Sequence, residues 1–179
     1  MDDTDDFDLW ADGFGPDSFD LDGDWTDYAS GTGRPATVPN KGNSGRRMQL
    51  AVWTGIENKL KRWGVDPKTI REDQAQVVAR RRAGKTVLVQ RNNQPDVQAI
   101  TPGGRRMINI EADNVRKAAN VLKELRRSRR NDPTARVAGV LFDPVTGRPV
   151  SKIVWDRQRG RFIHRAGDLR KSDILRMGD

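Results

Sequence analysis

The chain has 179 residues, of which 35% are hydrophobic and 32% are charged, so it can form one compact domain and is too apolar for complete disorder. It contains no cysteine, which excludes disulfide scaffolds, thiolate metal sites and cysteine nucleophiles. No apolar run approaches the roughly 18–20 residues that a membrane-spanning helix needs, and the Asp-rich first residues are unlike a secretory signal. We therefore expect a cytoplasmic protein, with a virion as the alternative setting.

The net charge of +8 is the difference between two blocks of opposite sign. Residues 1–40 contain eleven aspartates and one arginine, a net charge of −10. Residues 41–179 carry 32 Lys and Arg against 14 Asp and Glu, a net charge of +18. This excess is well above the net charge of ~2–8 that solubility needs, and guanidinium groups pair with phosphate bidentately. The sequence therefore predicts a body that binds nucleic acid, DNA or RNA, and no membrane.

The acidic block also holds six of the eleven aromatic residues, which is unusual for a purely solvating tail. We interpret residues 1–28 as a disordered arm and the Gly- and Pro-rich residues 29–45 as a flexible linker. One role for the arm is to mask the basic body as a mimic of nucleic acid. The other is to recruit a protein partner, because its aromatics are spaced to enter a groove. The candidate partner-binding residues are Phe7, Trp10, Phe14, Phe19 and Trp25.

A folded basic domain is expected over residues 46–170, followed by a tail at 171–179. An apolar stripe at helical spacing predicts a helix over 46–63, and Asp66-Pro67 is typical of the start of a second helix, over 67–83. After that helix the pattern changes to the period of strands. The expected elements are strands at 86–91, 97–101 and 105–110, a helix at 113–130, and strands at 136–142, 149–155 and 161–165.

Short turns join the last three strands, which indicates an antiparallel meander. The predicted fold class is α+β, with two or three helices packed on a small antiparallel sheet or meander and a disordered acidic N-terminal arm. The first two helices also suggest a helix–turn–helix, whose second helix would read DNA. The purely structural alternative for this pair is a helical hairpin that covers the sheet.

Enzymatic motifs are present only in incomplete form. The residues from Ala79 to Thr86 match a relaxed phosphate-binding loop, but the predicted order of helix and strand is reversed for that motif. Asp96 and Glu111 resemble part of a metal-nuclease pattern in which Asp113 replaces the final lysine. His164 is the single histidine and favours a surface or phosphate-contacting role. We expect no catalytic residues, no metal and no cofactor.

We therefore expect a non-enzymatic nucleic-acid-binding protein that contacts the phosphate backbone through an arginine-rich face. One alternative is a structural or assembly protein of a phage particle or nucleoprotein complex, able to form homo-oligomers, whose arm docks into a neighbouring subunit. The second alternative is a metal-dependent nuclease. The candidate phosphate contacts are Arg80, Arg81, Arg82, Lys85, Arg105, Arg106, Arg126, Arg127, Arg129, Arg130, Arg157, Arg159 and Arg161.

Overall fold

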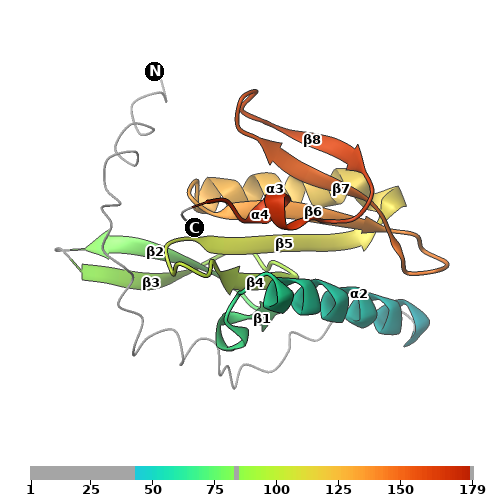
Figure 1. Ribbon diagram of the computed structural model, residues 1–179, viewed down its shortest axis with the longest axis horizontal. Helices are drawn as coiled ribbons and strands as arrows, with labels where there is room; N and C mark the ends of the chain where they lie inside the picture. The colour runs from blue at the N-terminus through green and yellow to red at the C-terminus, as the bar shows by residue number, and fades with distance from the viewer. Residues whose placement is uncertain (1–42, 83–84, 178–179) are drawn as a thin grey trace.

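The computed structural model describes residues 43–82 and 85–177 of the chain. These residues form a six-stranded sheet, a separate two-stranded hairpin and three α-helices (Figure 1). The helices are α2 (Asn43–Arg62), α3 (Ala118–Asn131) and α4 (Lys171–Ile174). The mixed α+β content expected from the sequence is confirmed. Within the described residues, no helix combines the length and the apolar character needed to cross a bilayer.

The main sheet is larger than the small meander that the sequence predicts. Its strand order is β1-β4-β5-β6-β7-β8, so β1 and β8 lie at its two edges. Neighbouring strands are antiparallel except β5 and β6, which are parallel because α3 carries the chain back between them. The strands are β1 (Arg71–Glu72), β4 (Val97–Ile100), β5 (Met107–Asn114), β6 (Arg136–Phe142), β7 (Pro149–Asp156) and β8 (Arg161–Ala166).

Helices cover both faces of the sheet because strand side chains alternate between the faces. Ile108 and Ile110 of β5 pack in the cluster that contains Leu60 of α2. On the other face, Leu125 of α3 is fully buried in a second cluster. A Cβ atom at Gly139 of β6 would meet the α3 side chain of Val121 at 2.6 Å, so glycine is what lets α3 lie this close to the sheet.

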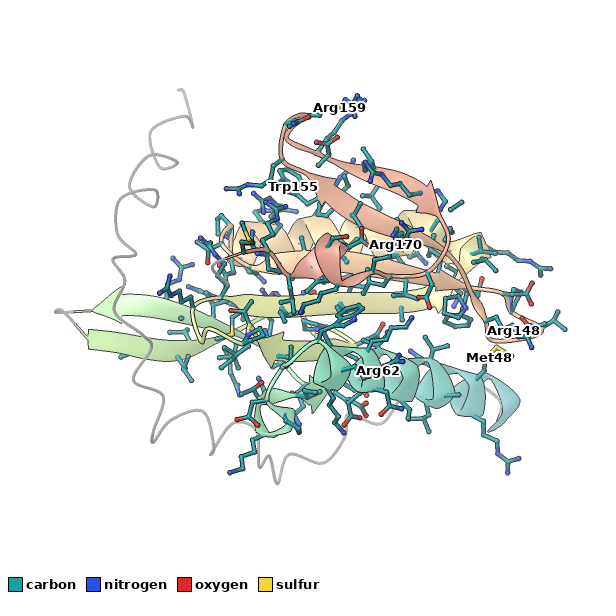
Figure 2. The ribbon with its side chains drawn as sticks, in the orientation of Figure 1. Met48, Arg62, Arg148, Trp155, Arg159 and Arg170 are labelled. Carbon is teal, nitrogen blue, oxygen red and sulfur yellow. The ribbon has the colours of Figure 1, made fainter. Side chains whose placement is uncertain are left out.

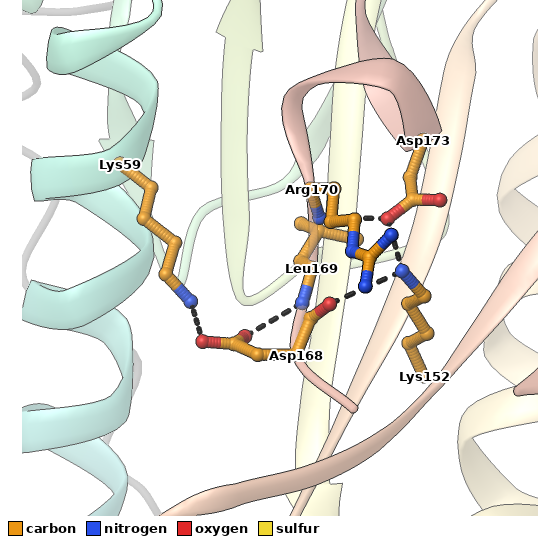
Figure 3. Close-up of polar contacts among 6 residues, drawn as sticks. All are labelled: Lys59, Lys152, Asp168, Leu169, Arg170 and Asp173. Carbon is orange, nitrogen blue, oxygen red and sulfur yellow. Dashed lines mark hydrogen bonds and ion pairs between the residues drawn. The ribbon is translucent and has the colours of Figure 1, made fainter. Parts of the chain in front are cut away.

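The segment after β8 contributes to the core, so the folded domain continues beyond residue 170. Ile174 of α4 is fully buried with the residues of α2. Lys152 of β7, itself 5% exposed, donates to the carbonyl oxygen of Asp168 (3.1 Å) and forms an ion pair with Asp173 (2.6 Å). Lys59 of α2 forms an ion pair with Asp168 (Figure 3). These contacts tie the end of the chain to both α2 and the sheet.

The helices predicted over 46–63 and 113–130 are present with shifted ends, but the helix predicted over 67–83 is wrong. Its capping signal is real, because Asp66 Oδ1 accepts a hydrogen bond from the Lys68 N–H (2.9 Å). The cap supports only a single 3₁₀ turn, η2 (Pro67–Thr69), after which the chain becomes extended.

Two strands occupy most of the remaining segment: β2 (Gln76–Arg82) is antiparallel to β3 (Lys85–Arg91). The β-branched Val77 and Val78 favour strand over helix, and Val78 pairs with Val89 in the register. Because the second helix is absent, the helix–turn–helix interpretation and the alternative of a helical hairpin are both wrong. In the stretch that resembles a phosphate-binding loop, from Ala79 to Thr86, the described residues belong to the end of β2 and the start of β3, whereas that motif needs a strand followed by a helix.

A buried polar network fixes the hairpin to the rest of the fold. Gln98 of β4 accepts from the Val77 N–H (3.0 Å) and donates to the Val77 carbonyl (3.0 Å), so one side chain satisfies the backbone as a neighbouring strand would. Gln98 also donates to Asn109 (2.6 Å), and Asn109 donates to the Ser128 hydroxyl (2.8 Å). Gln76 donates to the Ser128 carbonyl (3.0 Å). The first residues of β2 are thereby held against β4, β5 and α3.

Candidate nucleic-acid interface

Four segments that are far apart in the sequence meet at the end of the sheet where β5 and β6 begin (Figure 1). The parallel register pairs Ile108 with Arg136, and the antiparallel neighbours bring the β4–β5 turn (101–106) and the β7–β8 turn (157–160) to the same end. The last turns of α3 finish there as well, because α3 leads into β6. Arg80 of β2 donates to the last carbonyl of α3 at 3.4 Å, which places the hairpin beside them.

We call this region the basic end. It gathers the candidate phosphate contacts of α3, of both turns and of the hairpin, and it adds two arginines that the sequence analysis did not select. In chain order its arginines are Arg80, Arg105, Arg106, Arg126, Arg127, Arg129, Arg130, Arg136, Arg157, Arg159, Arg161 and Arg176. The backbones of Arg81, Arg82 and Lys85 continue the pairing of β2 and β3 next to it.

A cavity of about 80 Å³ lies at the centre of the basic end. It has Trp155 in its wall, and Asp173 is the only carboxylate residue among those that line it. Asp173 already forms an ion pair with Lys152 (2.6 Å). The arginines lining the cavity are Arg106, Arg129, Arg136, Arg157 and Arg176. The cavity is therefore a small site whose lining holds five arginines and one carboxylate residue.

Arg129 is held in place by an aromatic ring. Its guanidinium carbon lies 3.8 Å from the centre of the Trp155 ring, a cation–π contact. Phe162 of β8 meets Trp155 edge-on, with ring centres 5.0 Å apart. The two rings thus form a rigid support that fixes the direction of the Arg129 guanidinium.

The electrostatics of Arg129 show that the cluster is crowded with positive charge. Burial lowers the pKa of Arg129 from its ordinary value, and repulsion from Arg157 lowers it further. Asp132 opposes this shift, while Arg136 and Arg176 add to it. An arginine remains charged in spite of such a shift, so the repulsion persists as a cost that a bound anion would relieve.

The candidate arginines Arg127 and Arg159 have carboxylate partners. Arg127 contacts Glu124 at 3.3 Å on α3, and Arg159 contacts Asp156 at 3.0 Å in the β7–β8 turn. Exposed pairs of this kind contribute only ~0–1 kcal/mol, and each guanidinium keeps further N–H donors. We therefore regard Arg127 and Arg159 as weaker contacts than their exposed neighbours Arg126, Arg130 and Arg157.

The aromatic residues of the last strands serve the fold more than base stacking. Phe142 is 6% exposed and packs in the core, so it cannot reach a base. Trp155 and Phe162 are partly buried and contact each other, and Arg129 covers one face of the Trp155 ring. Contact through phosphate fits this surface better than stacking of bases.

The carboxylates of the nuclease alternative come together on the α3 face of the sheet. Asp96 Oδ2 accepts a hydrogen bond from the Ala112 N–H (2.6 Å) beside Glu111. Burial raises the pKa of Glu111 well above its ordinary value, and the charges of Asp96 and Glu124 raise it further. Among residues 43–82 and 85–177, no group of three His, Asp or Glu side chains is arranged to hold a metal ion. Asp96 and Glu111 thus lack a third ligand within the described chain.

His164 is on the exposed part of β8, where its Nε2 lies 2.8 Å from the Ser151 hydroxyl. Neither residue lines the cavity of the basic end. The sequence analysis did not anticipate this pair, and its geometry leaves His164 outside the arginine cluster.

Arg136 and Arg176 are the cavity arginines that the sequence analysis missed. Each stands outside the runs of arginines that drew attention, and only the parallel pairing of β6 and the folding back of the C-terminal segment bring them to the cavity. The arm residues Phe7, Trp10, Phe14, Phe19 and Trp25 lie outside the described residues.

Comparison with models of protein families, with curated proteins and with solved structures found no significant match for this chain.

Proposed function

We propose that this chain is a non-enzymatic nucleic-acid-binding protein that holds the phosphate backbone against the basic end. The observation that supports the proposal most strongly is the meeting of arginines from α3, two turns and a hairpin at one end of the sheet. Side chains scattered along the chain for solubility alone have no reason to line one cavity. Guanidinium groups match phosphate oxygens in geometry as well as in charge.

The opposite end of the molecule provides an internal comparison. Figure 2 shows Trp155 and Arg159 on one side and Arg148, in the β6–β7 turn, on the other. Near Arg148 the cations have acidic neighbours: Lys117 contacts Asp113 at 3.5 Å, and Arg116 lies within electrostatic range of Asp143. The opposite end therefore offers exposed cations, away from the cavity, for a matched control.

The test is the affinity for a fluorescent oligonucleotide as a function of salt concentration. Neutralising phosphates releases counterions, so the logarithm of the binding constant should fall linearly with the logarithm of salt, with a slope of about −0.9 for each phosphate contacted on duplex DNA. Replacing Arg126 and Arg130 with Gln in one variant should weaken binding and make this slope less steep.

The matched control replaces Arg116 and Arg148 with Gln, which removes the same charge at the opposite end of the sheet. Both pairs are exposed, so all of these variants should fold. The control should lose less affinity and keep the slope. Equal losses in the two variants, a salt-independent affinity, or no binding at low salt would overturn the proposal.

The acidic arm acts on the same surface in this proposal. Its net charge of −10 opposes the +18 of the rest of the chain, so it competes with nucleic acid for the arginines. The other role is recruitment of a protein partner through the aromatics of residues 7–25. The two roles differ in whether the acidic or the aromatic side chains change the affinity for nucleic acid.

A further inference from the structure

We infer that the arginine-lined cavity of the basic end binds a terminal phosphate, the monoester group at the end of a nucleic-acid strand. The inference rests on the proposed function and adds a ligand group to it. It is carried by the size of the cavity, by the number of guanidinium groups that surround it and by the ring that orients one of them.

The size of the cavity favours a phosphate group alone. Its volume of about 80 Å³ is larger than the ~10–15 Å³ that one water molecule requires. It is also far smaller than the roughly 300–1,000 Å³ of pockets that enclose larger ligands. The phosphate fits inside, and the sugar and base must remain outside, along the exposed arginines.

The charge of the lining favours a terminal phosphate over an internal one. An internal phosphodiester carries a single negative charge and two free oxygens. A monoester carries about −1.5 to −2 at neutral pH and has three strong acceptor oxygens. Five arginines line the cavity, and its one carboxylate residue, Asp173, is paired with Lys152. Five guanidinium charges around one small cavity suit the larger negative charge of a monoester better than the single charge of a diester.

The cluster is also prepared for an anion before one arrives. Trp155 fixes the guanidinium of Arg129 by the contact of 3.8 Å, so little side-chain freedom is lost on binding. Arg157 repels Arg129, and an anion placed between them turns that repulsion into two attractions. A preformed site of this kind discriminates between ligands by charge.

The test compares strands of identical sequence that carry a 5′-phosphate, a 3′-phosphate or only hydroxyl ends, with affinity measured by fluorescence anisotropy. We expect a phosphorylated strand to bind about tenfold more tightly than the hydroxyl strand, a typical gain for hydrogen bonds to a charged group. The two phosphorylated strands show which end enters. A closed circular strand of the same sequence should compete only as well as the hydroxyl strand.

Two variants in or next to the β7–β8 turn show whether the preference depends on the cavity. Arg157→Gln removes a lining side chain from an exposed turn position, whereas Arg161→Gln removes an exposed arginine that does not line the cavity. Arg157→Gln should abolish most of the preference for phosphate. Arg161→Gln should weaken all strands equally and keep the preference.

The outcomes separate the inference from the function it builds on. If all strands bind equally with a normal salt slope, the terminal-phosphate inference is wrong and the proposed function stands. If the preference survives in Arg157→Gln and also in Arg136→Gln, it arises elsewhere and the inference is again wrong. If no strand binds at low salt, the proposed function itself fails.

Discussion

The pairing of Arg129 with Trp155 shows how single residues define the basic end. A guanidinium stacked on a ring keeps its edge donors directed outward while its face is covered. A lysine has no planar face to stack and offers a point charge without the fork of donors. The site thus depends on arginine as a residue type and not only on positive charge.

Glu111 carries a prediction about pH. Burial raises the pKa of Glu111, and the negative charge of Asp96 raises it further. The Oε1 atom of Glu111 has no hydrogen-bond partner among the described residues. Above about pH 4.5, Glu111 loses its proton in the unfolded chain but keeps it in the folded chain. The free energy of unfolding therefore falls as the pH rises from about 4.5 to the raised pKa of Glu111. Glu111→Gln should raise the Tm at pH 7.5 by roughly 2–6 °C and change it little at pH 4.

Asp143 provides the control of opposite sign. Backbone hydrogen bonds from Thr146 and Val145, both 2.8 Å, lower the pKa of Asp143. Its contribution to stability is present above its ordinary pKa and is lost as pH falls through the lowered value. Asp143→Asn should therefore lower the Tm at pH 7.5 relative to the native chain. Scanning calorimetry across pH measures both variants, and a Glu111→Gln variant less stable than native at pH 7.5 would contradict the assignment.

At the scale of elements, Gly139 is a position where α3 lies close against the sheet. A Cβ atom there would lie 2.6 Å from Val121 and 3.2 Å from Leu125, so α3 would have to move. Gly139→Ala should cost about 1–3 kcal/mol in the free energy of unfolding. The matched control is Gly55→Ala in α2, where the added methyl group meets nothing within 4 Å and helix propensity favours alanine by up to about 1 kcal/mol.

Urea unfolding measures both glycine variants. Opposite signs are expected, because one substitution adds a clash and the other removes backbone freedom from the unfolded chain. A neutral Gly139→Ala would mean that α3 can move away from β6 without loss of packing.

Elements were predictable from the sequence where local signals and tertiary contacts agree. The strands after residue 136 follow this rule, since their alternating pattern is bounded by turns that close on Asp143 and Asp156. In the segment after Asp66, local signals and tertiary contacts disagree, and the helix predicted there is absent. Its cap is real, but Gln98 supplies a partner for the backbone of Val77, and no local pattern reveals a side chain that far along the chain.

At the scale of the whole molecule, the prediction concerns the charge of the acidic arm. Replacing the eleven aspartates of residues 1–40 with asparagine in the full chain removes the competing charge. If the arm masks the basic end, nonspecific affinity for nucleic acid should rise severalfold at low salt and by less at 0.5 M salt, because screening weakens the contact that is lost. Anisotropy with a hydroxyl-ended strand measures this.

The control changes the aromatics instead of the charges. Replacing Phe7, Trp10 and Phe14 with Ser keeps all aspartates, and it should leave the affinity for nucleic acid unchanged while abolishing recruitment of a protein partner. An unchanged affinity after the aspartates are replaced would argue against masking.

The sequence could indicate which residues are candidates to bind phosphate but not how they are arranged in space. The arginine runs of α3 and β2 are visible as runs. Arg136 and Arg176 become part of the cavity only through the parallel pairing of β5 with β6 and the folding back of the C-terminal segment. Their positions depend on long-range contacts, which composition and periodicity do not report.

The place of β8 at the edge of the sheet has a consequence for how copies of this chain behave together. In the described part of the chain β8 pairs with β7 alone, so one row of its backbone groups remains open to a further strand. Arg161, His164 and Arg165 are exposed along it, and the like charges of its arginines oppose edge-to-edge association of two molecules. Among the residues that the structure describes, this edge is protected by charge and no element covers it, so its protection weakens in concentrated salt and the chain is best kept dilute there.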